Sequence, residues 1–218
     1  MTLTFSGILD RHAFRHAADL VGGLVARPEV AAAWGQESSC AGMSVGGLAR
    51  HLVEQSLYVV EYLPVAAPAD APQISVLQHY AYSGWAHEGP DGPENQGICA
   101  GWNQQATVEG PDDTERLQSE AIEQLPGALG RAAESMYLPW QEVLMPTDDF
   151  IVTRMMEMVV HADDLAVSLD LPTPDFGAAV IEPVVGLLAA LSVVRHGQDA
   201  VVRTLVRPRR APGPVPAF

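Results

Sequence analysis

The sequence contains no lysine, only two cysteines and few charged residues. All 12 basic residues are arginine, so catalysis through a lysine amine is excluded. Cys40 and Cys99 form neither a CxxC motif nor a ladder of regular spacings, which argues against a disulfide framework. The net charge of −15 would repel a phosphate backbone, so we expect no nucleic-acid partner.

Signals for export or membrane insertion are also missing. The N-terminal stretch MTLTFSGILDRHAFRH has no basic start followed by an apolar run. No segment reaches the roughly 18 uninterrupted apolar residues that span a bilayer. We therefore expect a cytoplasmic protein with no membrane partner.

What the sequence does contain is helical periodicity over most of its length. The 218 residues, 48% of them hydrophobic, are enough for one sizeable core. No convincing strand pattern is present, and the segment 137–146 is expected to be an extended loop. The sequence thus predicts an all-α bundle with short connections. Apolar spacing, caps and breakers predict helices over residues 6–26, 44–63, 74–86, 94–109, 112–133, 149–171, 183–196 and 198–207.

The segment 149–171, DFIVTRMMEMVVHADDLAVSLDL, is the most informative of these helices. It has no Gly or Pro, an Asp pair at its start to cap it, and apolar residues around most of its circumference. Its polar stripe consists of Arg154, Glu157, His161 and Asp164, which fall within about 80° of one another. Glu157 and His161 lie one turn apart and could bind one metal ion together. The alternative is that the stripe faces water and Arg154 pairs with Glu157, and the ExxxH spacing taken alone favours this alternative.

A second histidine stands out in the helix predicted for residues 44–63. His51 lies beside the apolar seam of this helix, in line with Gln55, Tyr58 and Tyr62. This arrangement is typical of the wall of a polar pocket. It is also compatible with a core-edge histidine bonded to a backbone carbonyl, and periodicity alone favours this second interpretation.

Three stretches resemble one known family. SSCAGMSVGGLARHL, DDFIVTRMMEMVVHADDLAVSLDL, and RHGQDAVVRTLVR with the terminal PVPAF are similar to segments of the mycothiol-dependent maleylpyruvate isomerases. These enzymes belong to the DinB-like group of metal-dependent thiol transferases. The resemblance runs from about residue 8 to the C-terminus, and one departure is Met43, where many relatives carry Trp. It implies a single DinB-like four-helix bundle domain over residues 1–218, with additional short helices and a C-terminal extension.

The resemblance also implies a metal site. It places the metal ligands at His51, Glu157 and His161. Two imidazoles and one carboxylate suit Zn²⁺ or another first-row divalent ion, and three protein ligands leave positions open. An open position would let a thiol, by resemblance mycothiol, bind as its thiolate and add to an electrophilic small molecule.

Further roles are expected around this site. Asp164 would orient a ligand histidine, and Arg154 would pair with Glu157 or with a substrate carboxylate. Gln55, Tyr58 and Tyr62 would line the pocket beside His51. The expected activity is S-transfer if the adduct persists, and cis–trans isomerisation if the thiol leaves after bond rotation.

Two alternatives remain open from the sequence. The same ligand set describes non-haem iron enzymes that use no thiol, although those usually sit on a β-barrel. A DinB-like bundle could also be a binding protein without catalysis. Self-association into a homodimer is compatible with the sequence in each case.

Overall fold

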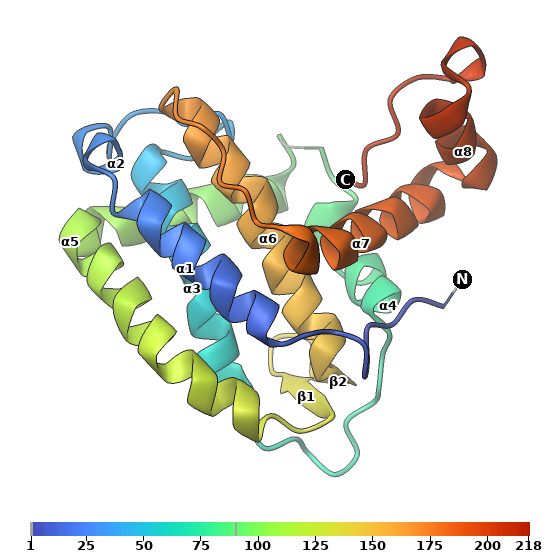
Figure 1. Cartoon of the computed structure of the whole chain (residues 1–218), viewed down its shortest axis with the longest axis horizontal. Helices are drawn as coiled ribbons and strands as arrows, with labels where there is room; N and C mark the ends of the chain where they lie inside the picture. Colours follow the sequence, from blue (N-terminus) through green and yellow to red (C-terminus); the bar gives the residue numbers. More distant parts are fainter. Residues whose placement is uncertain (1, 90) are drawn as a thin grey trace.

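The computed structural model describes residues 2–89 and 91–218 and is mainly helical (Figure 1). The helix α3 packs against α5 and α6, and α1 contacts the same two helices. The expected all-α four-helix bundle is therefore confirmed. Its helices are α1 (His12–Val25), α3 (Val45–Tyr62), α5 (Pro93–Arg131) and α6 (Thr147–Ser168).

The additional short helices are also present, and they lie around the bundle. A two-stranded hairpin precedes α6. The elements are α2 (Pro28–Ala32), α4 (Val76–Ala81), η1 (Gly84–Ala86), β1 (Ser135–Leu138), β2 (Val143–Pro146), α7 (Ala178–His196), α8 (Gln198–Val206) and η2 (Pro208–Arg210).

Helix α6 runs through the centre of the protein. It contacts α1, α3, α4 and α7, so most of its circumference is covered. Its large apolar side chains are fully buried, and each contributes about 1.5–3 kcal/mol relative to exposure. These residues are Phe150, Ile151, Met155, Met158 and Leu165. Arg154 and Glu157 in the middle of this helix are buried as well, whereas Asp163 near its end is exposed.

The start of α6 differs from the expected capped terminus. The helix begins at Thr147, and neither aspartate caps it with its side chain. Instead, Asp149 accepts hydrogen bonds from the backbone N–H of Phe5 (2.5 Å) and the hydroxyl of Thr4 (3.1 Å). Asp148 accepts from Arg11 Nε at 2.6 Å. The aspartate pair thus anchors the N-terminal segment to the bundle.

Helix α5 joins two segments that the sequence predicts as separate helices. They meet at a kink at Gly110, where φ is 71° and ψ is 178°. Glycine adopts a positive φ without steric cost, and Pro111 follows with no N–H to donate. The predicted interruption is therefore present as a bend, with helix continuing on both sides.

The hairpin replaces the extended loop expected for residues 137–146. Strands β1 and β2 pair antiparallel, with Leu138 opposite Val143. The segment contains two prolines and little alternation of polar and apolar residues, so its pattern did not predict this short pair of strands. The turn of the hairpin carries Trp140 and Gln141, both of which line the cavity described below.

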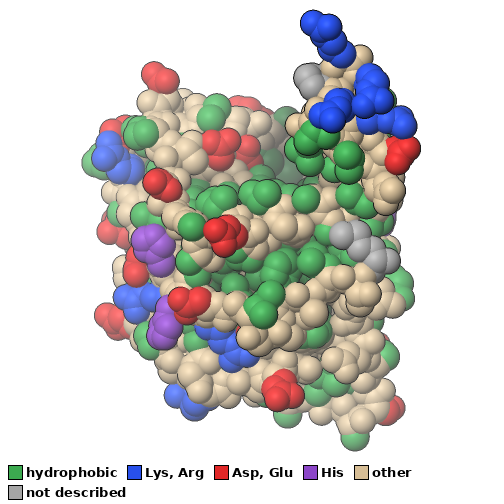
Figure 2. Space-filling model, turned by 45° about the vertical axis from the view of Figure 1, so that its right-hand side comes forward, with side chains coloured by type: hydrophobic (Ala, Val, Ile, Leu, Met, Phe, Trp, Pro, Cys, Tyr) green, Lys and Arg blue, Asp and Glu red, His purple; other side chains and the backbone are tan. Residues whose placement is uncertain are grey.

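Helix α7 follows α6 and bears on the membrane expectation. Its 19 residues have a mean hydropathy of 1.8, so by length and composition it could cross a membrane, and a third of that span is buried in the fold. One such helix is weak evidence for a membrane span, because the core helix of a soluble protein can have the same length and composition. Here it packs on α6, and the side chains of Val180, Val184 and Leu187 are buried. Beyond it, the exposed arginines of α8 and η2 gather at one end of the face in Figure 2.

The C-terminal tail folds back from α8 toward α4 (Figure 1). Ser192 Oγ donates to the carbonyl of Val215 at 2.6 Å, which fixes the tail along α7. The ring of Phe218 then packs against Tyr80, at 5.5 Å between centroids, and against Trp85, at 5.2 Å. The last residue of the chain therefore supports Trp85, which is part of the cavity wall.

Candidate functional site

Helix α3 brings His51 to the polar stripe of α6. Ser44 begins the helix by accepting a hydrogen bond from the N–H of Gly47 at 3.0 Å. Gly46 and Gly47 allow close packing, because a Cβ at either position would overlap Trp34 or Asn103. The start of α3 therefore lies close against Trp34, which follows α2, and against Asn103 of α5.

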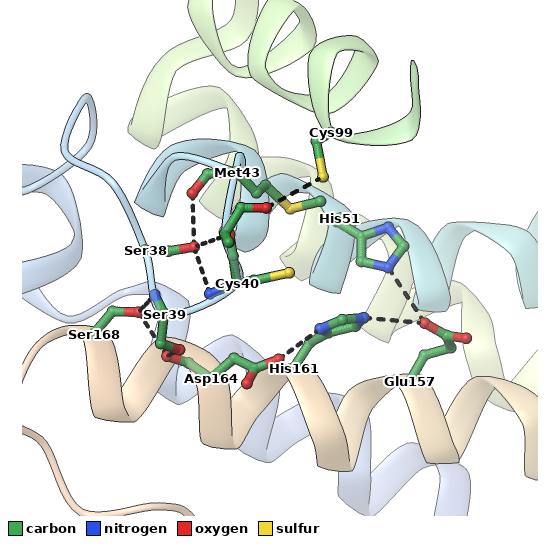
Figure 3. A network of polar contacts seen from close by, with 11 residues as sticks. Ser38, Ser39, Cys40, Met43, His51, Cys99, Glu157, His161, Asp164 and Ser168 are labelled. Carbon is green, nitrogen blue, oxygen red and sulfur yellow. Dashed lines mark hydrogen bonds and ion pairs between the residues drawn. The ribbon is translucent and has the colours of Figure 1, made fainter. Parts of the chain in front are cut away.

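The three predicted metal ligands converge on one point (Figure 3). The Nε2 atom of His51 is 3.4 Å from Oε2 of Glu157, and the Nε2 atom of His161 is 3.3 Å from the same oxygen. Their candidate ligand atoms all lie within 4.8 Å of one another. Two segments far apart in the sequence thus present two imidazoles and a carboxylate to a common centre.

The hydrogen bond of His161 to Asp164 orients its ring. The Nδ1 atom of His161 is 3.0 Å from Oδ2 of Asp164. A carboxylate accepts only, so Nδ1 carries the proton and donates it. In the neutral ring Nε2 then presents a lone pair to the group, which is the arrangement expected of a metal-ligating histidine.

The buried charges of this group shift its pKa values strongly. Burial alone would raise the pKa of Glu157, but contacts with His161 and His51 hold it well below its usual range. Burial alone would lower the pKa of His161, but its bonds to Asp164 and Glu157 raise it to about 9. Burial, opposed by the contact with Glu157, lowers the pKa of His51. The site therefore binds positive charge readily.

This donor set fits a divalent cation. When both rings are neutral with Nε2 facing Glu157, three acceptors point at each other, and only a proton or a cation between them relieves the repulsion. Two imidazoles and a carboxylate suit zinc and other first-row divalent ions. His51, Glu157 and His161 are the residues that would hold such an ion.

The ligand group opens onto a cavity of about 780 Å³. This volume is in the range of small-molecule sites. Much of its wall is aromatic, and two thiols also contribute to it. The lining includes Tyr58, Tyr82, Trp85, Trp102, Trp140, Cys40 and Cys99 in addition to the three ligand-group residues.

The loop before α3 places Cys40 beside the ligand group. Ser39 ties this loop to α6, since its N–H donates to Ser168 Oγ and its hydroxyl donates to the carbonyl of Asp164, each at 2.8 Å. Cys40, His161 and Asp164 also have ligand atoms within 4.8 Å of one another. Burial and the neighbouring Asp164 raise the pKa of Cys40 to about 11, so its thiol is protonated at neutral pH.

The hydrogen-bond partners of Arg154 differ from the ion pair with Glu157 that the sequence predicts. Among the described residues, Arg154 forms no ion pair with Glu157 or with any other carboxylate. Its Nη1 donates to Gln55 Oε1 at 2.9 Å and its Nε to Thr153 Oγ1 at 3.1 Å. The expected pairing with Glu157 is therefore corrected, because the Glu157 carboxylate turns toward the histidines.

The pocket roles expected on α3 hold in part. Tyr58 lines the cavity, whereas Gln55 and Tyr62 are not among the described residues that line it. Gln55 is fully buried behind Arg154 and donates to the carbonyl of His51 at 2.8 Å. Tyr62 instead packs edge-on against Trp140, with the ring centroids 5.1 Å apart. Both expectations for lining residues are corrected accordingly.

Sequence reasoning missed several residues of the cavity. His79 on α4 and Gln141 on the hairpin turn face it, and Nδ1 of His79 donates to Oε1 of Gln141 at 2.7 Å. Trp102 on α5 packs on His51, with centroids 5.2 Å apart. These residues come from three different elements, so no local spacing links them, and only their residue types could have attracted attention.

Comparisons with known proteins agree with this geometry. The family model for the mycothiol maleylpyruvate isomerase N-terminal domain matches residues 14–166, which include the whole ligand group. Comparison with curated proteins and with solved structures found no match. Because the matched region covers more than two thirds of the chain, the protein belongs to the mycothiol maleylpyruvate isomerase N-terminal domain family.

Proposed function

We propose that the protein is a metal-dependent enzyme that activates mycothiol, a low-molecular-weight thiol, and adds it to an electrophilic small molecule. The observation that carries this proposal is the convergence of His51, Glu157 and His161 at the wall of a cavity of about 780 Å³. The family membership supports the link to mycothiol. The ligand set favours Zn²⁺ as the ion.

The expected chemistry follows from the donor set. A bound divalent cation would stabilise a thiolate at neutral pH, so that no separate general base is required. In transfer, the sulfur would form a bond to one carbon of a double bond, and the adjacent carbon would take up a proton. In isomerisation, the same electron pair would expel the thiolate after rotation about the former double bond. Neither reaction requires a reactant beyond the thiol and the electrophile.

The chain's own residues would orient the partners. Asp164 holds the ring of His161 through its bond to Nδ1, and the buried position of Glu157 keeps its carboxylate beside both histidines. The aromatic side chains Tyr58, Trp102 and Trp140 would exclude water from one side of the reacting groups. Since these residues lie on separate helices and the hairpin, the bundle would preorganise the site before ligands enter.

Calorimetry of the zinc-loaded protein with mycothiol tests the proposal. We expect saturable binding that His51→Ala abolishes and that His16→Ala, an exposed histidine on α1, leaves intact. Metal analysis should show loss of zinc in His51→Ala only. Absence of heat with the zinc-loaded wild type would refute thiol activation, and bound iron with oxygen-dependent turnover would favour the non-haem iron alternative.

A further inference from the structure

The positive charge of the chain is concentrated in its C-terminal part. Residues 183–218 contain five of the 12 basic residues but only one of the 27 acidic residues, so this segment carries a net charge of +4 and residues 1–182 carry −19. The one acidic residue, Asp199, pairs with Arg203 at 3.0 Å, and the other four arginines of the segment pair with no carboxylate of the described residues. An otherwise acidic protein therefore presents one basic end, which Figure 2 shows as a cluster of blue side chains.

Helix α8, which belongs to this basic end, projects from the bundle. Figure 1 shows α8 beyond the end of α7 and away from α1, α3 and α5. It packs mainly on α7, and among its own side chains only that of Val201 is buried. Most of the surface of α8 is therefore available to a partner.

The exposed face of α8 combines apolar and basic side chains. Val202, Leu205 and Val206 are 54%, 71% and 53% exposed. They fall within about 100° of one another around the helix axis, and Arg203 lies about 60° beyond Val206. The helix thus presents an apolar stripe to solvent with a basic residue at its edge.

Further basic residues follow α8 directly. Arg207, Arg209 and Arg210 are all exposed. The chain then turns back, because the hydroxyl of Thr204 on α8 donates to the carbonyl of Gly213 at 3.3 Å. The segment that carries these arginines is therefore closed against the helix, so that its charge stays beside the apolar stripe.

This combination of side chains is typical of a helix that lies on a membrane surface. Such a helix buries its apolar face at the boundary between lipid headgroups and acyl chains, and its basic residues are attracted to anionic headgroups. The expectation of no membrane partner depends on missing export and spanning signals. Docking on a membrane surface requires neither signal.

We propose that α8 and the arginines that follow it dock the protein on an anionic lipid surface. Because α8 projects, its arginines face the lipid while the acidic bundle stays on the far side, and repulsion from more distant carboxylates is screened over about 8 Å at physiological ionic strength. The proposal is independent of the metal site and of the proposed enzymatic function.

A protein partner, including a second copy of this chain, fits the same surface less well. A specific protein interface commonly buries about 800 Å² on each partner. Helix α8 has nine residues and exposes three large apolar side chains. A bilayer deforms around such a small projection, whereas a protein partner would need a matching groove.

Co-sedimentation of the full-length protein with lipid vesicles tests the proposal. Vesicles of equal parts phosphatidylglycerol and phosphatidylcholine are compared with vesicles of phosphatidylcholine alone. We expect at least about tenfold tighter binding to the anionic vesicles, since each arginine near such a surface contributes about fivefold. Added salt should weaken this binding, because it screens the attraction between arginines and headgroups.

Two double variants of equal charge locate the basic contact. Arg209→Gln with Arg210→Gln should weaken binding to the anionic vesicles by about tenfold or more. Arg27→Gln with Arg116→Gln removes the same charge from exposed arginines elsewhere and should leave binding unchanged. Equal losses in the two double variants would overturn the proposal, because the effect would then come from net charge alone.

The apolar contact has its own matched pair. Leu205→Ser should weaken binding to the anionic vesicles by about tenfold. Val108→Ser, at a residue of α5 that is 77% exposed, should not. Equal effects of these two substitutions would also overturn the proposal.

The wild type alone decides the proposal if a variant fails to fold. Absence of binding, or equal binding to the two kinds of vesicle, would overturn it. Light scattering after gel filtration gives the oligomeric state. A wild-type dimer that Leu205→Ser converts to a monomer, without vesicle binding, would assign the face to a second copy and overturn the proposal as well.

Discussion

His161 and Asp164 lie one turn apart on α6, and the Nδ1 atom of His161 donates to Oδ2 of Asp164 over 3.0 Å. Removing the charge of this partner should weaken metal binding, since groups that orient a ligand histidine typically contribute about 10–100-fold in affinity. We expect Asp164→Asn to lower zinc affinity by about tenfold or more, as measured by competition with a chromophoric chelator.

The control for this prediction lies on the same helix. Asp163 is exposed and accepts a hydrogen bond from the Thr173 hydroxyl at 2.5 Å, away from the ligand group. Asp163→Asn should therefore leave zinc affinity unchanged. Equal losses in the two variants would show that the effect is general electrostatics and unrelated to the orientation of His161.

Zinc affinity should also depend on pH. His161 has its pKa raised from 6.5 to about 9 in the metal-free protein, so zinc must displace a proton from it at neutral pH. Release of one proton makes affinity rise by about tenfold per pH unit. We expect this rise between pH 6.5 and 9, with a plateau above, and a flat profile over this range would contradict the assigned protonation state.

The stability of the metal-free protein, prepared with a chelator, should fall as pH rises, whereas zinc affinity rises. A folded-state pKa above the unfolded value of 6.5 means that the proton on His161 stabilises the fold fully below pH 6.5, and that this stabilisation is lost as pH rises through about 9. We expect the free energy of unfolding to fall by about 1–3 kcal/mol over this window. Urea denaturation at several pH values measures it, and His161→Gln should show a smaller decrease.

Close packing of α3 provides a stability test away from the site chemistry. A Cβ at Gly46 would lie 2.5 Å from the ring of Trp34, whose Nε1 is bonded to the carbonyl of Ala106 at 3.0 Å. The ring therefore cannot move freely, and Gly46→Ala should cost about 1–3 kcal/mol. Gly23 on α1 has no neighbour within 4 Å of such a Cβ, so Gly23→Ala should stabilise by up to about 1 kcal/mol in the same denaturation assay.

Helical periodicity predicted that two of the three residues of the ligand group lie together, although it did not identify them as metal ligands. Glu157 and His161 share one face of a helix, and the spacing alone predicts that their side chains lie together. The spacing of α3 could not show that His51 meets them, because that contact depends on how two helices pack. The resemblance to a family supplied this link, and the geometry agrees with it.

The same limitation explains the corrected residues. Gln55 and Tyr62 share a helix face with His51, but the direction of the cavity is set by α5, α6 and the hairpin. Helical spacing alone would place Arg50 on the solvent side of α3. In the fold, Glu109 of α5 covers it, and the ion pair is buried. The spacing of polar and apolar residues predicts which side chains share a face of a helix. Which neighbouring elements cover that face depends on the complete fold.

Phe218 ends the chain by packing on Trp85, a wall residue of the cavity, although the matched family region stops at residue 166. The wall of the cavity is therefore supported by a residue outside the region that the family model matches. Variation in the tail could retune which molecules the cavity admits while every residue of the ligand group stays the same. Relatives with identical ligands and different C-terminal ends are accordingly where divergent substrate preferences should be sought.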